Sequence, residues 1–95
     1  LSVAVMQAMA AGLPIIASDI RGNRDLLASE PHTRSKHYLL PTKDADAYAA
    51  KINKILDDPA LAQALGTENH ANCKKYFDIA LVHNLMTTIY TELTD

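Results

Sequence analysis

The sequence predicts an α/β fold, an incomplete Rossmann-like half in which two short parallel strands lie among several helices. Helical and strand patterns follow one another in the order helix, strand, short helix, strand and three further helices. Two strands joined by a helix form a right-handed parallel unit. Because the faces and edges of a parallel sheet both need cover, two short strands are too few for a free-standing one. We therefore expect further strands upstream of Leu1.

The first helix and strand are indicated by one long apolar run. Residues from Ser2 to Ala11 are apolar almost throughout, which predicts a helix buried on most sides. Ser2 is a suitable N-cap, and Gly12 a suitable left-handed residue after the helix, with Pro14 preventing its continuation. The β-branched run at 14–17 then predicts a short strand covered on both faces.

The next forty residues are predicted to hold a short helix, a loop and a second strand. Asn23 or Asp25 can cap a helix that ends at Leu27. Residues 29–36 are polar and are expected to form an exposed loop, and 37–40 form the second strand candidate. Asp44 then caps an amphipathic helix whose predicted buried stripe is Tyr48, Ile52, Ile55 and Leu56.

Two helices are predicted in the last part of the chain. Asp58 followed by Pro59 marks a helix start, and this helix continues or restarts after Gly66 up to Tyr76. Asp78 caps the final helix, which has the strongest periodic signal in the chain. Its apolar stripe consists of Ile79, Val82, Leu85, Met86, Ile89, Tyr90 and Leu93. This stripe is expected to cover the domain core, with a partner-binding face as the alternative.

Composition narrows the class of protein. A net charge of −2 gives no basic footprint, which argues against a nucleic-acid partner. A single cysteine, Cys73, excludes an internal disulfide framework and is typical of a reducing cytoplasm. The longest apolar run is broken by Gly12 and Pro14, so it falls short of the roughly 18 to 20 residues that cross a bilayer. The sequence thus predicts a soluble, intracellular protein.

The start of the first helix is a candidate anion site. The amide groups of Ser2, Val3 and Ala4 have no acceptors within the helix and point toward its N-terminal end. An anion such as a diphosphate can be held there. The alternative, which applies to most helix N-termini, is that Ser2 only caps a core helix.

The run LSVAVMQAMAAGLPIIAS at residues 1–18 resembles the nucleotide-sugar half of retaining glycosyltransferases of the two-domain GT-B type, often called family 4 or group 1. In that family a Glu, seven residues and a second Glu precede an Ala-Met-Ala segment, a glycine turn and a strand. The similarity continues at 19–25, 39–41, 55–59, 65–66 and 76–78, and so spans nearly the whole chain.

The resemblance implies a function and a domain assignment. Residues 1–77 would be the second half of the donor-binding domain, and 78–95 a helix that packs on it and toward an N-terminal domain. The enzyme would transfer a sugar from a nucleotide-diphosphate sugar to a saccharide or lipid-linked saccharide, with retention, in polysaccharide or cell-surface glycan synthesis. The resemblance implies no metal or cofactor. It implies a place in the cytoplasm or at the inner face of the membrane.

Site residues follow from the same resemblance. The backbone of Leu1, Ser2 and Val3 would face the sugar and diphosphate, and Gln7 stands where the family's second Glu binds the ribose hydroxyls. The first Glu would lie two residues before Leu1. No catalytic residue is therefore assigned within this chain. The isolated 95 residues are expected to be inactive, because the basic residues and the acceptor domain of the family are also missing.

Two other groups of residues are weaker candidates. Asp19, Arg21 and Arg24 follow the first strand and could line the cleft between two domains, or form a turn with a local ion pair. His70 and Cys73 lie three residues apart and could share one helix face as metal ligands, although a solvated helix is favoured.

Two function classes compete with glycosyl transfer. The chain could be a non-catalytic interaction module, which Gln7 favours slightly and for which self-association would be expected. It could also belong to a nucleotide-sugar epimerase or a phosphorylase built on the same two-domain fold. Neither the base, the sugar nor the acceptor is indicated by the residues present.

Overall fold

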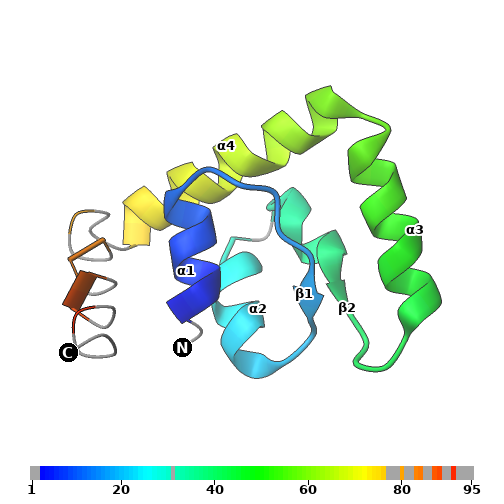
Figure 1. The fold of residues 1–95 in the computed structure, drawn as a ribbon, viewed down its shortest axis with the longest axis horizontal. Coiled ribbons are helices and arrows are strands. Elements are labelled where there is room, and N and C mark those ends of the chain that lie inside the picture. Colours follow the sequence, from blue (N-terminus) through cyan, green and yellow to red (C-terminus); the bar gives the residue numbers. More distant parts are fainter. Residues whose placement is uncertain are drawn as a thin grey trace.

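The computed structural model describes residues 3–30 and 32–76, and within the last part of the chain residues 80, 83–84, 87–88 and 91. The elements up to α4 follow the predicted order, with an additional 3₁₀ helix before the second strand (Figure 1). They are α1 (Val3–Ala10), β1 (Ala17–Ser18), α2 (Arg21–Leu27), the 3₁₀ helix η1 (Arg34–Tyr38), β2 (Leu39–Leu40), α3 (Ala45–Leu56) and α4 (Pro59–Tyr76). The predicted cap Asp78 and the apolar stripe of the final helix lie outside the described residues.

The two strands form a parallel pair, which confirms the α/β class. Ala17 pairs with Leu39, and Ser18 pairs with Leu40. The amide of Asp19 donates to the carbonyl oxygen of Leu40 at 2.7 Å, which extends the pairing past the end of β1. The strands lie between α1 and α2 on one side and α3 on the other (Figure 1).

Both strands are shorter than the sequence predicts. The run at 14–16 is not paired, and β2 begins at Leu39 rather than at residue 37. The cause is η1, because residues wound into a 3₁₀ helix up to Tyr38 offer no extended partner opposite 14–16. Pro14 moreover has no amide hydrogen to donate to a ladder.

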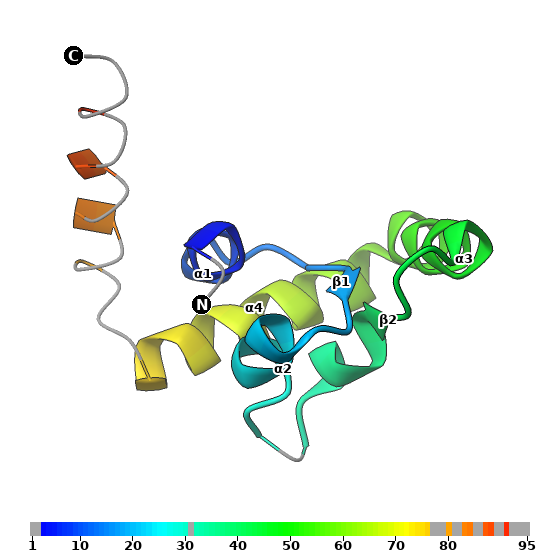
Figure 2. The same cartoon turned by 90° about the horizontal axis from the view of Figure 1, so that it is seen from below.

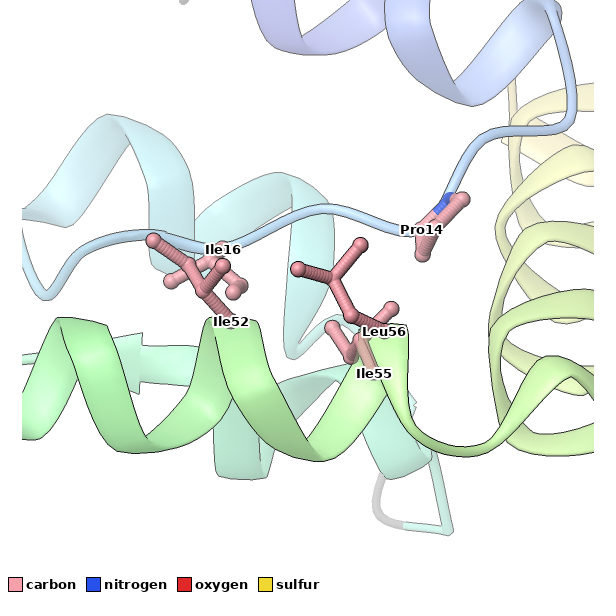
Figure 3. A pocket seen from close by; sticks show the side chains of 5 residues that line it. All are labelled: Pro14, Ile16, Ile52, Ile55 and Leu56. Atoms are coloured by element: carbon pink, nitrogen blue, oxygen red, sulfur yellow. The ribbon is translucent and has the colours of Figure 1, made fainter.

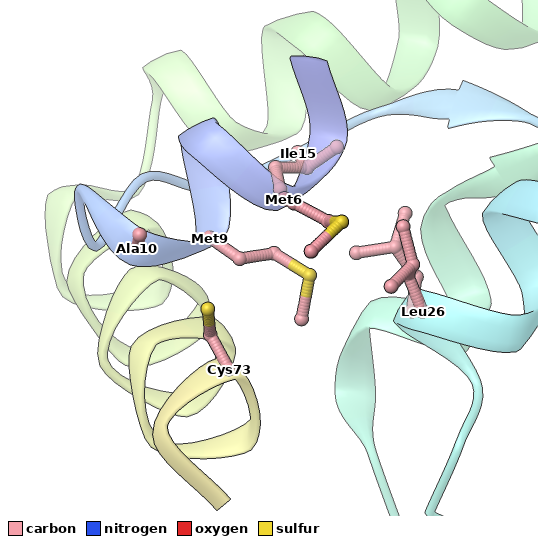
Figure 4. Packing of buried hydrophobic residues seen from close by; sticks show 7 residues of the cluster. Met6, Met9, Ala10, Ile15, Leu26 and Cys73 are labelled. Carbon is pink, nitrogen blue, oxygen red and sulfur yellow. The ribbon is translucent and has the colours of Figure 1, made fainter. Parts of the chain in front are cut away.

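A single hydrophobic cluster joins α1, α2 and α4. Met6 and Met9 of α1 point toward Leu26 of α2, and Cys73 of α4 lies beside them (Figure 4). Ala4 and Gln7 are exposed, so α1 is buried along one broad face rather than on most sides. The buried members of the cluster are Met6, Met9, Ala10, Ile15, Leu26, Leu27 and Cys73.

Two glycines allow α1 and α4 to approach closely. Gly12 has φ of 73°, the left-handed conformation predicted for the residue after α1. Gly66 lies inside α4, where a Cβ would overlap the carbonyl oxygen of Gly12. Because α4 continues without a break through Gly66, this contact lies midway along the helix that runs past α1 (Figure 2).

The predicted caps of the two long helices are confirmed. An Asp44 carboxylate oxygen accepts from the amide of Ala47 at 3.0 Å. The carboxylate of Asp58 accepts from the amide of Leu61 at 3.1 Å. Each satisfies one of the orphan amides at a helix start. In the part of the chain that the structure describes, no helix has the length and apolar character needed to span a membrane.

The predicted buried stripe of α3 is wrong. No residue of α3 is buried, and the side chains of Ile52 and Leu56 are 46% and 71% exposed. Together with Pro14 and Ile16 they line an open apolar hollow of about 330 Å³ (Figure 3). The amphipathic pattern is correct, but the described elements on that side are too narrow to cover the face.

Residues 29–36 are not an exposed loop throughout. Thr33 and Ser35 are buried, because side chains of α4 bond to this segment and draw it inward. The predicted cap of α2 is also wrong. α2 begins at Arg21, so Asn23 and Asp25 lie within the helix.

Replacing Gly66 by alanine is expected to destabilise the fold by about 3 kcal/mol, because the new methyl group meets rigid backbone at Gly12. Urea unfolding followed by circular dichroism measures the change. Gly22→Ala is the matched control. Nothing lies within 4 Å of a Cβ at this helical position, so a gain of about 0.5 to 1 kcal/mol is expected. Equal effects of the two substitutions would contradict the close approach.

Lys43 precedes the Asp44 cap and has φ of 70°, which strains a residue that carries a Cβ. Lys43→Gly is therefore expected to raise the free energy of unfolding by about 0.5 to 1 kcal/mol, after the loss of chain entropy is subtracted. Lys54→Gly, within α3, is expected to lower it by about 1 kcal/mol. Thermal unfolding of both variants gives the comparison, and a loss of stability at position 43 would show that the strain is absent.

Candidate functional site

The carboxyl edge of the sheet brings the predicted site segments together. In Figure 1 both strands run toward the lower edge of the molecule, where α1 begins and where the chain turns into α3. The segment that follows β1 starts at this edge as well. In open α/β sheets, ligands bind outside the carboxyl ends of the strands and against helix N-termini. This edge is therefore the candidate site.

The start of α1 provides backbone amides at the edge. Leu1 and Ser2 lie outside the described residues, and Val3 is the first described residue of the helix. The first turn contains no acidic residue that would repel an anion. Amides of a first helical turn have no acceptor four residues earlier in the helix, and the helix dipole adds a partial positive charge. The chemistry of this end suits an anionic group.

Gln7 lies one turn further along α1. Its side chain is exposed and makes no hydrogen bond with any residue that the structure describes. Residues four apart lie on the same face of a helix, so Gln7 shares a face with Val3. An amide side chain offers one acceptor oxygen and two donor hydrogens. It can therefore both accept from and donate to the hydroxyls of a sugar.

The segment after β1, consisting of a short loop and the first turn of α2, contains the three predicted polar residues, and two of them pair. The Nε of Arg24 lies 3.3 Å from a carboxylate oxygen of Asp19, and both side chains are about half exposed. This ion pair is the one expected if these residues form a turn with a local ion pair instead of lining a cleft. Arg21 opens α2 with an exposed side chain and forms no salt bridge with the described residues. Arg21 is thus the unneutralised cation of this segment.

Two residues at the edge were not among the predicted site residues. Asn23 is buried, and its Nδ2 donates to the carbonyl oxygen of Ser18 at 2.9 Å, which fixes the path of the loop after β1. Lys43 occupies the corresponding turn after β2. A basic residue in a short turn between a strand and a helix was the available signal for Lys43. Asn23 gave none, since its burial depends on the fold.

A second hollow, which is polar, lies between α4 and the segment before η1 and has a volume of about 260 Å³. Glu30 on its rim accepts hydrogen bonds from Lys75 at 2.6 Å and from the hydroxyl of Tyr76. The bond from Lys75, with that from Tyr76, holds the pKa of Glu30 below its ordinary value. Glu68 is engaged as well, with the amides of Arg34 and Ser35. The hollow therefore contains carboxylates that already have partners.

His70 and Cys73, for which a solvated helix was favoured over metal binding, do not share one environment. Cys73 is fully buried in the core, and this burial raises the pKa of its thiol. His70 is exposed on α4. Within 3–30, 32–76 and the described positions beyond them, no group of three or more His, Cys, Asp or Glu side chains could hold a metal ion.

Comparison with known proteins gives two matches and one absence. The family model described as Glycosyl transferases group 1 matches residues 1–72. Over all 95 residues the chain is 28% identical to a protein of Bacillus subtilis (strain 168) named "Putative glycosyltransferase EpsD", and it spans 24% of that protein's length. No solved structure matches the chain significantly.

The family match covers well over half of the chain and includes α1, β1, β2 and the whole candidate edge. The relative that matches along the full chain is named for the same activity. The chain therefore belongs to the family Glycosyl transferases group 1.

Proposed function

We propose that residues 1–77 are the second half of the donor-binding domain of a retaining glycosyltransferase, and that 78–95 form a helix packing toward its N-terminal domain. One observation carries the proposal. Within the part that matches the family, the start of α1 and the carboxyl ends of β1 and β2 share one edge. That is where α/β proteins bind nucleotides. The donor would be a nucleotide-diphosphate sugar.

The diphosphate would lie against the backbone at Leu1, Ser2 and Val3. Main-chain amides bind phosphate oxygens whatever the side chain, which explains why apolar residues are acceptable here. The lack of an acidic residue in the first turn of α1 supports this role. Arg21, which has no described salt-bridge partner, can add a cationic side chain at the cleft. Arg24 contributes less net charge, since Asp19 lies beside it.

Gln7 would bind the ribose hydroxyls. Its exposed side chain lies one turn beyond the first residues of α1, on the Val3 face. A glutamate would accept charge-assisted hydrogen bonds from two hydroxyls, whereas glutamine has a single neutral acceptor. The ribose contact is therefore expected to be weaker than one made by a carboxylate, by about 1 to 2 kcal/mol.

The reaction would move the sugar to a saccharide or lipid-linked acceptor with retention, in polysaccharide or cell-surface glycan synthesis at the cytoplasmic side of a membrane. The chain's own contribution is to hold the donor and to stabilise the charge that develops on the departing diphosphate. Positioning of this kind contributes about 7 to 11 kcal/mol at best. Preorganised amides and cations contribute further to the stabilisation of the transition state.

A non-catalytic interaction module is the second candidate. The exposed apolar side chains of Ile52 and Leu56 favour it, because exposed apolar patches are typical of interaction surfaces. The two functions differ in nucleotide binding. If the full-length protein containing this chain ignores every nucleoside diphosphate, the donor-binding proposal fails and the interaction module is supported.

Substituting Gln7 by glutamate in the full-length protein is expected to tighten nucleoside diphosphate binding by about 5- to 30-fold, since a carboxylate restores charge-assisted hydrogen bonds to the ribose. Isothermal titration with UDP and GDP measures the dissociation constant. Gln63→Glu makes the same chemical change at an exposed position of α4 and controls for added negative charge. Equal changes in the two variants would remove Gln7 from the ribose site.

The isolated chain of 95 residues is expected to show no sugar transfer, because it carries no catalytic residue of its own. Release of UDP or GDP from nucleotide sugars, with a saccharide acceptor present, is the assay. The full-length protein under the same conditions is the positive control. Turnover by the isolated chain above the buffer blank would refute this assignment of the catalytic groups.

A further inference from the structure

A buried polar pair connects α4 with the segments that precede the two strands of the sheet. Ser35 and Asn69 are each 0% exposed. The hydroxyl of Ser35 donates to Oδ1 of Asn69 at 2.5 Å, and Nδ2 of Asn69 donates to the carbonyl oxygen of Leu13 at 2.9 Å. Among the residues that the structure describes, no buried side-chain nitrogen or oxygen lacks a partner. The pair is thus a fully satisfied link within the interior.

The two partners of Asn69 lie on the segments that lead into the strands. Leu13 precedes the paired residue Ala17 of β1 by four positions, and Ser35 precedes the paired residue Leu39 of β2 by four. Glu68, next to Asn69, accepts from the amides of Arg34 at 2.6 Å and Ser35 at 3.3 Å. One turn of α4 therefore bonds to the segments that lead into both strands, at the amino edge of the sheet.

The strands themselves contribute little to fixing the register of β1 on β2. Each contains two residues, so few ladder bonds resist a shift of β1 against β2. A shift by one residue moves a strand by about 3.3 Å and turns its side chains to the opposite face. Hydrogen bonds do not survive a displacement of that size. The two bonds of Asn69 can therefore both form only in the observed pairing, provided that the segments next to the strands move with them.

We propose that Asn69 is a positioning residue that sets the register of β1 on β2, and through it the placement of the loop that follows β1. The amide of Asp19 donates to the Leu40 carbonyl oxygen at 2.7 Å, so the start of this loop is fixed by the same pairing. The importance of the loop for the donor rests on the proposed function. The role of Asn69 in setting the register does not depend on the proposed function.

The test compares Asn69→Leu with Asn72→Leu in the full-length protein that contains this chain. Asn72 lies one turn further along α4, and its Nδ2 donates to Oγ1 of Thr33 at 3.3 Å without reaching Leu13. NMR measures the hydrogen-exchange rates of the backbone amides of Asp19 and of Leu65, a buried residue of α4, and the readout is the ratio of the first rate to the second. Asn69→Leu is expected to raise this ratio about tenfold, the effect of one lost net hydrogen bond. Asn72→Leu is expected to leave it within about twofold.

Cross-strand proton contacts between Ala17 and Leu39 supply the second readout, and Asn69→Leu is expected to weaken them. An unchanged ratio with unchanged contacts would overturn the proposal, since Asn69 would then stabilise α4 alone. If Asn69→Leu does not fold, Ser35→Ala decides. This substitution removes the Ser35 bond, one of the two bonds of Asn69. The proposal then requires that the Asp19 to Leu65 exchange ratio rise at least about threefold.

A titration with UDP and GDP separates this proposal from the donor site. If the full-length parent binds neither nucleotide while Asn69→Leu still raises the Asp19 exchange ratio, the proposed function fails and the register role stands. If the parent binds nucleotide and the ratio is unchanged, the register role fails and the donor site stands.

Discussion

The close approach of α1 and α4 at Gly12 and Gly66 is the constraint on which the rest of the structure depends. A Cβ at Gly66 would overlap the Gly12 backbone, so any larger residue would force the two helices apart. The short distance between the two helices brings Cys73 against Met9 in the core and places Asn69 within reach of Leu13. The hydrophobic cluster and the polar link to the sheet therefore share one geometric origin.

The two edges of the sheet have separate tasks. At the amino edge, Glu68 and Asn69 hold the segments that enter the strands. At the carboxyl edge, Ala4 in the first described turn of α1 and Arg21 at the start of α2 remain exposed. Rigid support behind an exposed binding edge is the arrangement that α/β enzymes use, because a ligand site on a well-held scaffold loses less entropy on binding.

The caps of α3 and α4 and the left-handed glycine were predicted correctly, whereas the cap of α2 and the burial set by long-range packing were not. Asp44, Asp58 and Gly12 act within one helical turn, so their roles can be deduced from neighbouring residues. The burial of Ser35 and the exposure of Leu56 depend on where α4 lies and on how far the sheet extends. In the candidate site, the resemblance indicated Gln7 and the loop after β1. Asn23 was missed, because a buried asparagine within a seven-residue helix has no sequence signature.

The link from Asn69 to Leu13 joins residues 56 positions apart, which has a consequence for folding during synthesis. The ribosome adds about 5 to 20 residues per second, so roughly 3 to 11 seconds separate the appearance of these two partners. Both strands are complete once Leu40 has been added, so for about the last 1.5 to 6 seconds of that interval they are present without the helix that holds them. A parallel pair of this kind is slow to form and open to incorrect pairing. Completion of α4, rather than of the sheet, therefore marks the moment at which this part of the chain can take its native form.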